Sequence, residues 1–207
     1  MPDSELARLS ETDAAARFRH LLADSTRIRM RSDVEVGSCL SGGLDSSAII
    51  CLARDIIGDD KPYHVFTGRF PETASDEWEF AKEIIDHARV TSHVVAPTGE
   101  GLRDDIAEFC WFNELPTGST SQYAQWCVFR LAKEQGVTVL LDGQGADELL
   151  GGYEQYFADY LKSLADAGHA DRVAEEADAI KARYPLALKN TIASWKTRLP
   201  TAVRWRL

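Results

Sequence analysis

The sequence contains few cysteines and no long apolar run. Its 207 residues include four cysteines, and none of them forms a C-x-x-C pair. This spacing excludes a disulfide scaffold and favours reduced, mostly buried thiols. No run reaches the about 18 consecutive apolar residues of a transmembrane helix, and the acidic start Met1–Glu5 is unlike a signal peptide. We therefore expect a cytoplasmic protein that does not bind a membrane.

Basic residues are also scarce. The chain has 23 Lys and Arg against 33 Asp and Glu, a formal net charge of −10, which weighs against nonspecific nucleic-acid binding. The exception is residues 179–207, which contain seven basic residues, two tryptophans and no acidic residue. This composition is compatible with an RNA-binding or membrane-surface segment. We favour a helical segment that packs on an acidic surface, because Pro185 and Pro200 bracket a stretch of helical length.

Predicted strands and helices alternate over most of the chain. Ser10 and Asp13 form a capping box before a helix whose apolar residues fall on one face. Strands are predicted at 34–40, 63–70, 91–96 and 137–142, with helices at 48–58, 75–85, 100–112 and 121–135. This alternation predicts an α/β fold, in which a parallel sheet has helices on both faces. A helical segment follows, with helices predicted at 154–166, 170–183 and 185–199.

The predicted domain boundary lies at Gly151-Gly152. It separates an α/β core at 1–152 from a helical extension at 153–207. The last residues, Trp205-Arg206-Leu207, contain no helix-stop signal, so the sequence predicts that this extension is truncated.

A glycine- and serine-rich loop, Ser41-Gly42-Gly43-Leu44-Asp45-Ser46-Ser47, follows the first predicted strand. Its glycines allow backbone N–H groups to approach a ligand, the next helix directs its positive end at the loop, and serine hydroxyls can donate to phosphate oxygens. Asp45 is an acid in an anion site, which is consistent with a cation that accompanies phosphates. The loop lacks the spacing of a Walker A loop, of the G-x-G-x-x-G fingerprint and of the G-x-S-x-G elbow. It therefore predicts a different phosphate-binding loop, rather than a plain turn capped by serine.

This loop resembles the pyrophosphate-binding (PP) loop of the ATP pyrophosphatases, a group that includes asparagine synthetases, β-lactam synthetase and NAD synthetases. The segment Gly143–Tyr153 is similar to S-G-E-G-A-D-E-L-F-G-G-Y in the synthetase domain of asparagine synthetases. Residues 32–37 and 117–123 also look like that family. The resemblance covers about residues 5–160 and implies an adenine nucleotide α-hydrolase-like fold.

The resemblance implies that ATP activates a carboxylate. The side-chain carboxylate of aspartate attacks the α-phosphate and releases pyrophosphate, and ammonia then displaces AMP to give asparagine. Such a site needs hydrogen-bond donors and Mg²⁺ rather than a protein nucleophile. ATP, Mg²⁺, aspartate and ammonia are therefore the implied ligands. A glutaminase domain is expected outside this chain, and a homodimer is an assembly that the sequence leaves open.

The resemblance also assigns roles to individual residues. Asp45 and Asp147 would hold Mg²⁺, although Asp147 is alternatively the N-cap of the helix that follows it. The pyrophosphate would bind Ser41, Gly42, Gly43, Asp45, Ser46 and Ser47, and adenosine would contact Leu40, Gly68, Asp142 and Gly143. Gln144 stands where the family has a glutamate, which either orients the reacting groups or acts as a base. We favour orientation, in which glutamine can replace glutamate; if the glutamate is a base, this protein should be a slow synthetase.

Other polar residues are more ambiguous. Thr117, Ser119, Thr120 and Ser121 align with the acceptor pocket of the family, but a polar loop that caps helix 121–135 explains them nearly as well. The five histidines show no ligand spacing and are interpreted as structural. Asp76 and Glu77 are predicted to be first-turn acids of helix 75–85.

Three functional hypotheses remain at this stage. The first is the ATP-binding part of an asparagine-synthase-type enzyme. The second is a relative that activates another carboxylate, such as a cell-surface sugar or a natural-product precursor. The third is a nucleotide-binding module that no longer catalyses.

Overall fold

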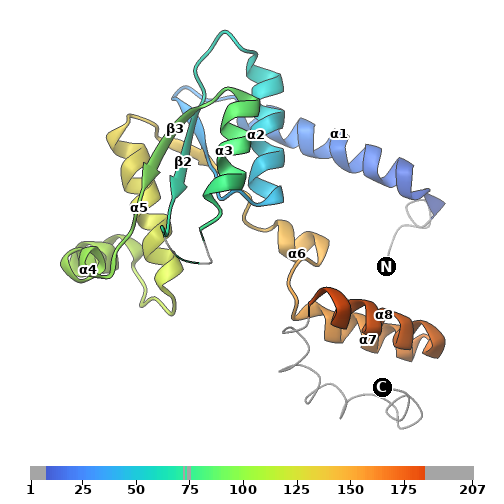
Figure 1. Cartoon of the computed structure of the whole chain (residues 1–207). Coiled ribbons are helices and arrows are strands. Elements are labelled where there is room, and N and C mark those ends of the chain that lie inside the picture. Colours follow the sequence, from blue (N-terminus) through green and yellow to red (C-terminus); the bar gives the residue numbers. More distant parts are fainter. Residues whose placement is uncertain (1–7, 72, 74–75, 185–207) are drawn as a thin grey trace. The chain divides into compact units, whose positions relative to one another are not determined.

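The structure is a computed structural model that describes residues 8–71, 73 and 76–184 (Figure 1). The chain divides into two compact units, Met1–Gly143 and Gln144–Leu207. The predicted domain boundary after residue 152 stays a prediction.

The first unit is built around a parallel sheet. Its strands are β1 (Val36–Cys39), β2 (His64–Gly68), β3 (Thr91–Val95) and β4 (Val139–Leu141). They lie in the order β3-β2-β1-β4, and each neighbouring pair is parallel. The predicted α/β class and all four predicted strands are therefore confirmed, although each observed strand is shorter than its predicted range.

The strand order reverses between β1 and β4. The chain proceeds outward from β1 to β2 and β3, and then returns to place β4 on the other side of β1. The connections that leave the carboxyl ends of β1 and β4 therefore diverge. In open α/β sheets a ligand commonly binds at such a point, beyond the carboxyl ends of the strands.

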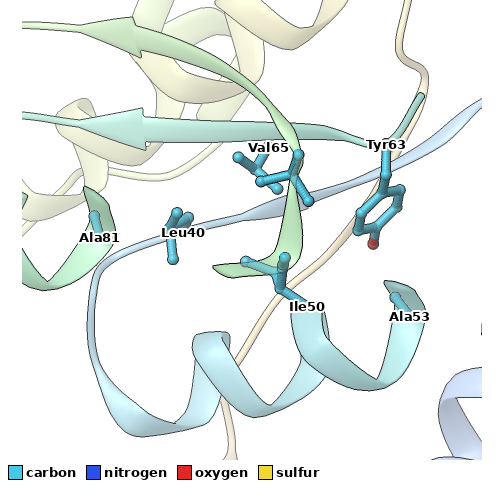
Figure 2. Close-up of a cluster of buried hydrophobic side chains, with 8 residues drawn as sticks. Leu40, Ile50, Ala53, Tyr63, Val65 and Ala81 are labelled. Carbon is cyan, nitrogen blue, oxygen red and sulfur yellow. The ribbon is translucent and has the colours of Figure 1, made fainter. Parts of the chain in front are cut away.

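Helices cover both faces of this sheet, as predicted. The helices of the first unit are α1 (Glu11–Arg29), α2 (Leu44–Ile57), α3 (Trp78–Ala88), α4 (Gly99–Asn113) and α5 (Thr120–Glu134). Ile50 and Ala53 of α2 and Ala81 of α3 pack with Val65 of β2 and with Leu40 (Figure 2). The next residue of β2 points to the other face, because side chains alternate along a strand. Phe66 accordingly packs with Val128 and Ala132 of α5.

Helix α1 begins as predicted but buries little of its apolar face. Ser10 accepts a hydrogen bond from the Asp13 amide at 3.1 Å and caps the helix. Phe18, Leu21 and Ile28 are nevertheless 46%, 57% and 50% exposed. The buried residue of α1 is Thr26, in the part of the helix near α2, so helical periodicity alone did not reveal which turns pack.

The second unit contains a short helix and a helical hairpin. Its helices are α6 (Ala146–Leu150), α7 (Tyr156–Asp166) and α8 (Ala170–Arg183). Leu161 and Leu164 of α7 pack with Val173, Ala177 and Ile180 of α8. The predicted helices at 154–166 and 170–183 are confirmed. The helix predicted at 185–199 and both tryptophans of the basic segment lie outside the described residues.

The four cysteines are free, as expected, but they are less buried than predicted. Cys127 is buried, Cys39 and Cys51 are half-buried, and Cys110 is exposed. Over the described residues, no helix combines the length and apolar character that a membrane crossing requires.

Candidate functional site

The segment 41–47 lies at the strand-order reversal: residues 41–43 complete the turn that follows β1, and residues 44–47 form the first turn of α2. Gly42 adopts φ +91°, a conformation that L side chains rarely adopt. A Cβ at this position would lie 2.7 Å from the Glu77 carbonyl oxygen and 3.1 Å from the Ala81 amide nitrogen. The start of α3 therefore packs directly against the loop, and glycine is the residue that permits this contact.

The serine hydroxyls of the loop bond to one another and to its backbone. Ser41 Oγ lies 3.0 Å from Ser46 Oγ and accepts a hydrogen bond from the Gly43 amide at 3.1 Å. Ser46 and Ser47 donate to the Gly43 carbonyl oxygen at 3.2 and 2.7 Å. These bonds shape the loop before a ligand arrives. A bound phosphate would have to redirect some of the hydroxyl donors.

The amino end of α2 is open toward the loop. Its N-cap is Gly43, which has no side chain with which to cap the first amide groups. The leading N–H groups of a helix have no intrahelical acceptor, and they attract an anion together with the helix dipole. Asp45 lies in the first turn and is half-buried. The arrangement can therefore bind an anion beside a carboxylate.

Gly143 brings the end of β4 against this helix start. A Cβ on Gly143 would lie 3.0 Å from the Ser46 amide nitrogen and 3.1 Å from Asp45 Cβ. The two glycine-rich segments of the sequence therefore meet at Gly143. A larger side chain there would press on the first turn of α2.

Asp142 precedes this contact and faces α5. Its Oδ2 accepts a hydrogen bond from Gln125 Nε2 at 3.2 Å. The parallel pairing of β1 with β4 places the Cys39 thiol beside the Asp142 carboxylate. Burial and the neighbouring Asp142 charge raise the pKa of Cys39 well above its ordinary range, which keeps the thiol protonated.

The remaining predicted adenosine contacts lie at the same edge of the sheet. Leu40 is 2% exposed and packs in the core, so its backbone is the part that remains for a ligand. Gly68 ends β2, and a Cβ there would lie 3.3 Å from Val128 Cγ2. The structure thus collects Leu40, Gly68, Asp142 and Gly143 at the carboxyl ends of three strands.

The polar segment before α5 forms a cap. Ser119 is the N-cap of α5 and accepts a hydrogen bond from the Ser121 amide at 3.2 Å, while the two hydroxyls lie 2.8 Å apart. Thr117 is half-buried, and Thr120 is exposed. The capping interpretation of this segment is therefore confirmed. The acceptor-binding role of Thr117, Ser119, Thr120 and Ser121 stays a prediction.

Gln144 and Asp147 belong to the second unit. The N-cap of α6 is Gly145, so the alternative that Asp147 caps this helix is wrong. Asp147 lies in the first turn, where its carboxylate covers Gly152: a Cβ on Gly152 would lie 1.9 Å from Asp147 Oδ1. Since Asp45 lies in the first unit, the joint binding of Mg²⁺ by these two carboxylates stays a prediction.

The interpretation of Asp76 and Glu77 as first-turn acids is wrong. Helix α3 begins at Trp78, with Glu77 as its N-cap, so both acids precede the helix. Asp76 instead accepts a hydrogen bond from Arg69 Nη2 at 2.6 Å, and the Arg69 guanidinium lies 4.7 Å from the centroid of the Trp78 ring. Residue 75, where the predicted helix 75–85 begins, lies outside the described residues.

Two of the five histidines form a pair away from this edge of the sheet. His64 begins β2, and its Nδ1 lies 2.8 Å from Nε2 of His93 on β3. Burial and the neighbouring His64 lower the pKa of His93. Within the described ranges, no group of three His, Cys, Asp or Glu is placed to hold a metal ion.

Sequence reasoning did not identify Gln125 and Arg69. Gln125 meets a carboxylate 17 positions away in the chain, and Arg69 binds Asp76 across a connection between a strand and a helix. Neither residue lies within a recognisable motif. Their roles come from the way that the sheet brings distant segments together.

The sequence profile of the asparagine synthase family matches residues 17–205. The chain belongs to the asparagine synthase family. This family uses ATP, and its match covers both glycine-rich segments of the site.

Several curated relatives share this domain. A putative glutamine-hydrolysing asparagine synthetase of Methanocaldococcus jannaschii is 35% identical over 150 residues, which is 70% of this chain and 28% of the relative. Glutamine-hydrolysing asparagine synthetase 1 of Bacillus subtilis is 36% identical over 67% of this chain and 21% of the relative. The amidase chry2 of Gibberella zeae is 28% identical over 78% of this chain and 25% of the relative. The chain thus spans about a quarter of the length of these relatives.

Among solved structures, an NH₃-dependent NAD synthetase from Campylobacter jejuni aligns with 67% of this chain and 60% of its own chain. Its TM-score is 0.44 and its sequence identity is 16%.

Proposed function

We propose that this chain is the ATP-binding synthetase part of an enzyme that makes asparagine. In this reaction the side-chain carboxylate of aspartate attacks the α-phosphate of ATP, forming β-aspartyl-AMP and releasing pyrophosphate. Ammonia then displaces AMP. The proposal depends on one observation: an asparagine synthase chain places an open helix start, a glycine–serine loop and Gly143 together at the strand-order reversal.

The pyrophosphate portion of ATP binds at the start of α2. Backbone amides of the helix and the hydroxyls of Ser41, Ser46 and Ser47 supply donors for the charge that develops on the leaving group. Because the amides are fixed by the helix, they need no reorganisation during the reaction. Adenosine lies along the strand ends, where Leu40, Gly68, Asp142 and Gly143 meet.

Magnesium fits the donors at this position. Mg²⁺ prefers oxygen ligands and is often held by one or two carboxylates together with substrate phosphates and water. Asp45 places one carboxylate in the first turn of α2, and Asp147 is the proposed second ligand. Bound there, Mg²⁺ would neutralise phosphate charge.

The acceptor and ammonia meet beside this nucleotide site. Thr117, Ser119, Thr120 and Ser121 form the proposed aspartate pocket, and Gln144 orients the reacting groups. An amide can both donate and accept hydrogen bonds, which suits an orienting role, but it does not take a proton as glutamate does. Ammonia comes from a glutaminase domain outside this chain, consistent with relatives that are named as glutamine-hydrolysing.

A second candidate acceptor is a carboxylate other than that of aspartate. The relatives include two proteins named as amidases, chry2 of Gibberella zeae and chyE of Penicillium rubens, each 28% identical to this chain. Because these names do not mention aspartate, we also propose the alternative of a different carboxylate, such as a cell-surface sugar or a natural-product precursor, as the acceptor. This alternative leaves the proposed nucleotide chemistry unchanged.

The experiment measures exchange of labelled pyrophosphate into ATP in the presence of Mg²⁺ and single carboxylates. Exchange that depends on aspartate supports the proposal, and exchange with a different acid supports the second candidate. If the chain binds ATP but no acid supports exchange, the proposal is contradicted, and the chain is a nucleotide-binding module that does not catalyse this reaction. The variant Gly143→Val is the control, because its side chain would press on the first turn of α2 and should abolish the signal.

A further inference from the structure

The Asp142 carboxylate accepts a hydrogen bond from helix α5 and lies beside a thiol of β1. Gln125 Nε2 donates to Asp142 Oδ2 at 3.2 Å, and the charge of the same carboxylate, after burial, raises the pKa of the neighbouring Cys39 thiol. The pairing of Ser38 with Leu141 places the next residues of β1 and β4, Cys39 and Asp142, beside each other. The carboxylate therefore connects helix α5 to the end of β1 and to the end of its edge neighbour β4.

The backbone that follows this carboxylate contacts the opposite side of the site. A Cβ at Gly143 would lie 3.0 Å from the Ser46 amide and 3.1 Å from Asp45 Cβ, so the peptide between residues 142 and 143 is closely fitted to the first turn of α2. On the other strand, Cys39 is followed by Leu40 and the glycine–serine loop. A displacement of Asp142 would thus change the position of Gly143 relative to the amides that face the loop.

Gln125 lies in the amino-terminal half of α5, on the side of the helix that faces the sheet. Val128 lies one turn further along the helix and packs with Phe66 in the apolar cluster. Spacing of three residues places both side chains on the same face of the helix. At the position of Gln125, however, this face meets a carboxylate instead of an apolar side chain.

We propose that Gln125 is a positioning residue for nucleotide binding: it holds the Asp142 carboxylate and thereby fixes the backbone of residues 142–143 against the first turn of α2. This inference rests on the proposed function, because it assigns Gln125 to the support of the ATP site. Cys39 assists from the neighbouring strand. The effect of Gln125 on ATP therefore passes through Asp142.

The substitution Gln125→Glu tests this arrangement because it conserves size and replaces the donor with a second carboxylate. Two carboxylates at this distance cannot both ionise easily, so the pKa of one of them is raised. At low pH the shared proton restores a hydrogen bond, whereas at high pH the two charges repel each other. Titratable groups near the pair include Cys39 on β1 and Asp45 beyond Gly143. Gln135→Glu, at the exposed C-cap of the same helix, is the matched control.

The measurement is the calorimetric Kd of Mg·ATP for the full chain between about pH 5.5 and 8.5, a range that spans a raised carboxylate pKa. The ratio of Kd for Gln125→Glu to Kd for wild type should be near one at the acidic end and rise to about tenfold, or about 1.4 kcal/mol, at the basic end. The Gln135→Glu ratio should stay flat. A flat ratio for Gln125→Glu would overturn the inference.

A second variant covers the case in which Gln125→Glu fails to fold. Gln125→Met keeps the length of the side chain without the donor, and it should weaken Mg·ATP binding several-fold at every pH while leaving the melting temperature near that of wild type. Wild-type affinity in this variant would also overturn the inference. If wild type itself does not bind ATP, the proposed function fails together with the inference. Binding by wild type with no effect of Gln125 refutes the inference alone.

Discussion

Three glycines of the two glycine-rich segments stand where neighbouring atoms leave no room for a side chain. Gly42 is close to the backbone of α3, Gly143 to the first turn of α2, and Gly152 to the Asp147 carboxylate. The first two contacts are with backbone atoms, which cannot move aside by rotating a side chain. These two glycines therefore fix the distances between the elements that form the proposed nucleotide site.

We expect Gly42→Ala to destabilise the protein more than Gly136→Ala. Both glycines have positive φ, +91° and +80°, so each substitution costs about 1 kcal/mol in strain. A Cβ on Gly136 would meet no atom within 4 Å, whereas one on Gly42 would lie 2.7 Å from a carbonyl oxygen. This overlap adds about 1–3 kcal/mol. Urea denaturation of both variants measures the difference, and equal losses would contradict the packing of α3 on the loop.

The variant Asp45→Asn should weaken binding of Mg·ATP by about tenfold, or about 1.4 kcal/mol, because the metal loses an anionic ligand. Its affinity for ATP without metal should be unchanged or slightly higher, since a negative charge near the phosphates is removed. Asp55→Asn, on the exposed last turn of α2, is the control. Calorimetry with and without Mg²⁺ distinguishes the two effects. The same loss with and without the metal would argue against a metal ligand.

At the scale of single elements, the position of α3 is set by contacts just before the helix. Arg69 follows β2, Asp76 precedes α3, and the two side chains form an ion pair at 2.6 Å. Arg69 also lies over the Trp78 ring at 4.7 Å from its centroid. Since Glu77 and Ala81 contact Gly42, the ion pair helps to hold α3 against the loop.

This ion pair predicts a pH-dependent contribution to stability. The hydrogen bond from Arg69, assisted by backbone donors of Phe70 and Trp78, lowers the pKa of Asp76 below its ordinary value of 3.8. The stabilisation is therefore fully present above pH 3.8 and is lost as the pH falls through the lowered pKa. Asp76→Asn should melt at a lower temperature than wild type at neutral pH. Melting curves at decreasing pH should converge in strongly acidic solution, and a constant difference would contradict this account.

At the scale of the whole molecule, the first unit is a sheet with an apolar layer on each face. One layer contains Ile50 and Val65, and the other contains Phe66 and Val128. Adjacent residues of β2 thus stabilise different layers. The candidate site lies at the carboxyl ends of the strands, where the helices that cover the two faces of the sheet both reach it.

Substitutions in either layer should be strongly destabilising. Ile50 and Phe66 are at most 1% exposed, so we expect Ile50→Ala to cost about 2–5 kcal/mol and Phe66→Ala about 3–5 kcal/mol of unfolding free energy. Ile56→Ala and Phe80→Ala are the controls, since these side chains are 39% and 62% exposed. Their cost should stay below about 1 kcal/mol. Denaturant titrations check all four variants. A small effect of Phe66→Ala would mean that α5 does not close the second layer.

Most of the fold was accessible from local patterns. Strand-length apolar runs that alternate with capped helical segments are properties of a few neighbouring residues, so the sequence predicted the parallel sheet and the helices on both of its faces. The start of α3 was misplaced because Asp76 has two explanations at the level of sequence. An acidic side chain near a helix start can be stabilised by the helix dipole, or it can form an ion pair with a cation elsewhere in the chain. For Asp76 this cation is Arg69, and their contact exists only in the folded chain.

The sequence by itself determined the family, because the glycine–serine loop and the Gly143–Tyr153 segment are motifs of consecutive residues. The tertiary structure decided which atoms meet. It placed Gly143 against the start of α2 and Gln125 against Asp142, and it left much of the apolar face of α1 exposed. These contacts join residues far apart in the chain, and their distances depend on strand order and packing. No local spacing encodes them.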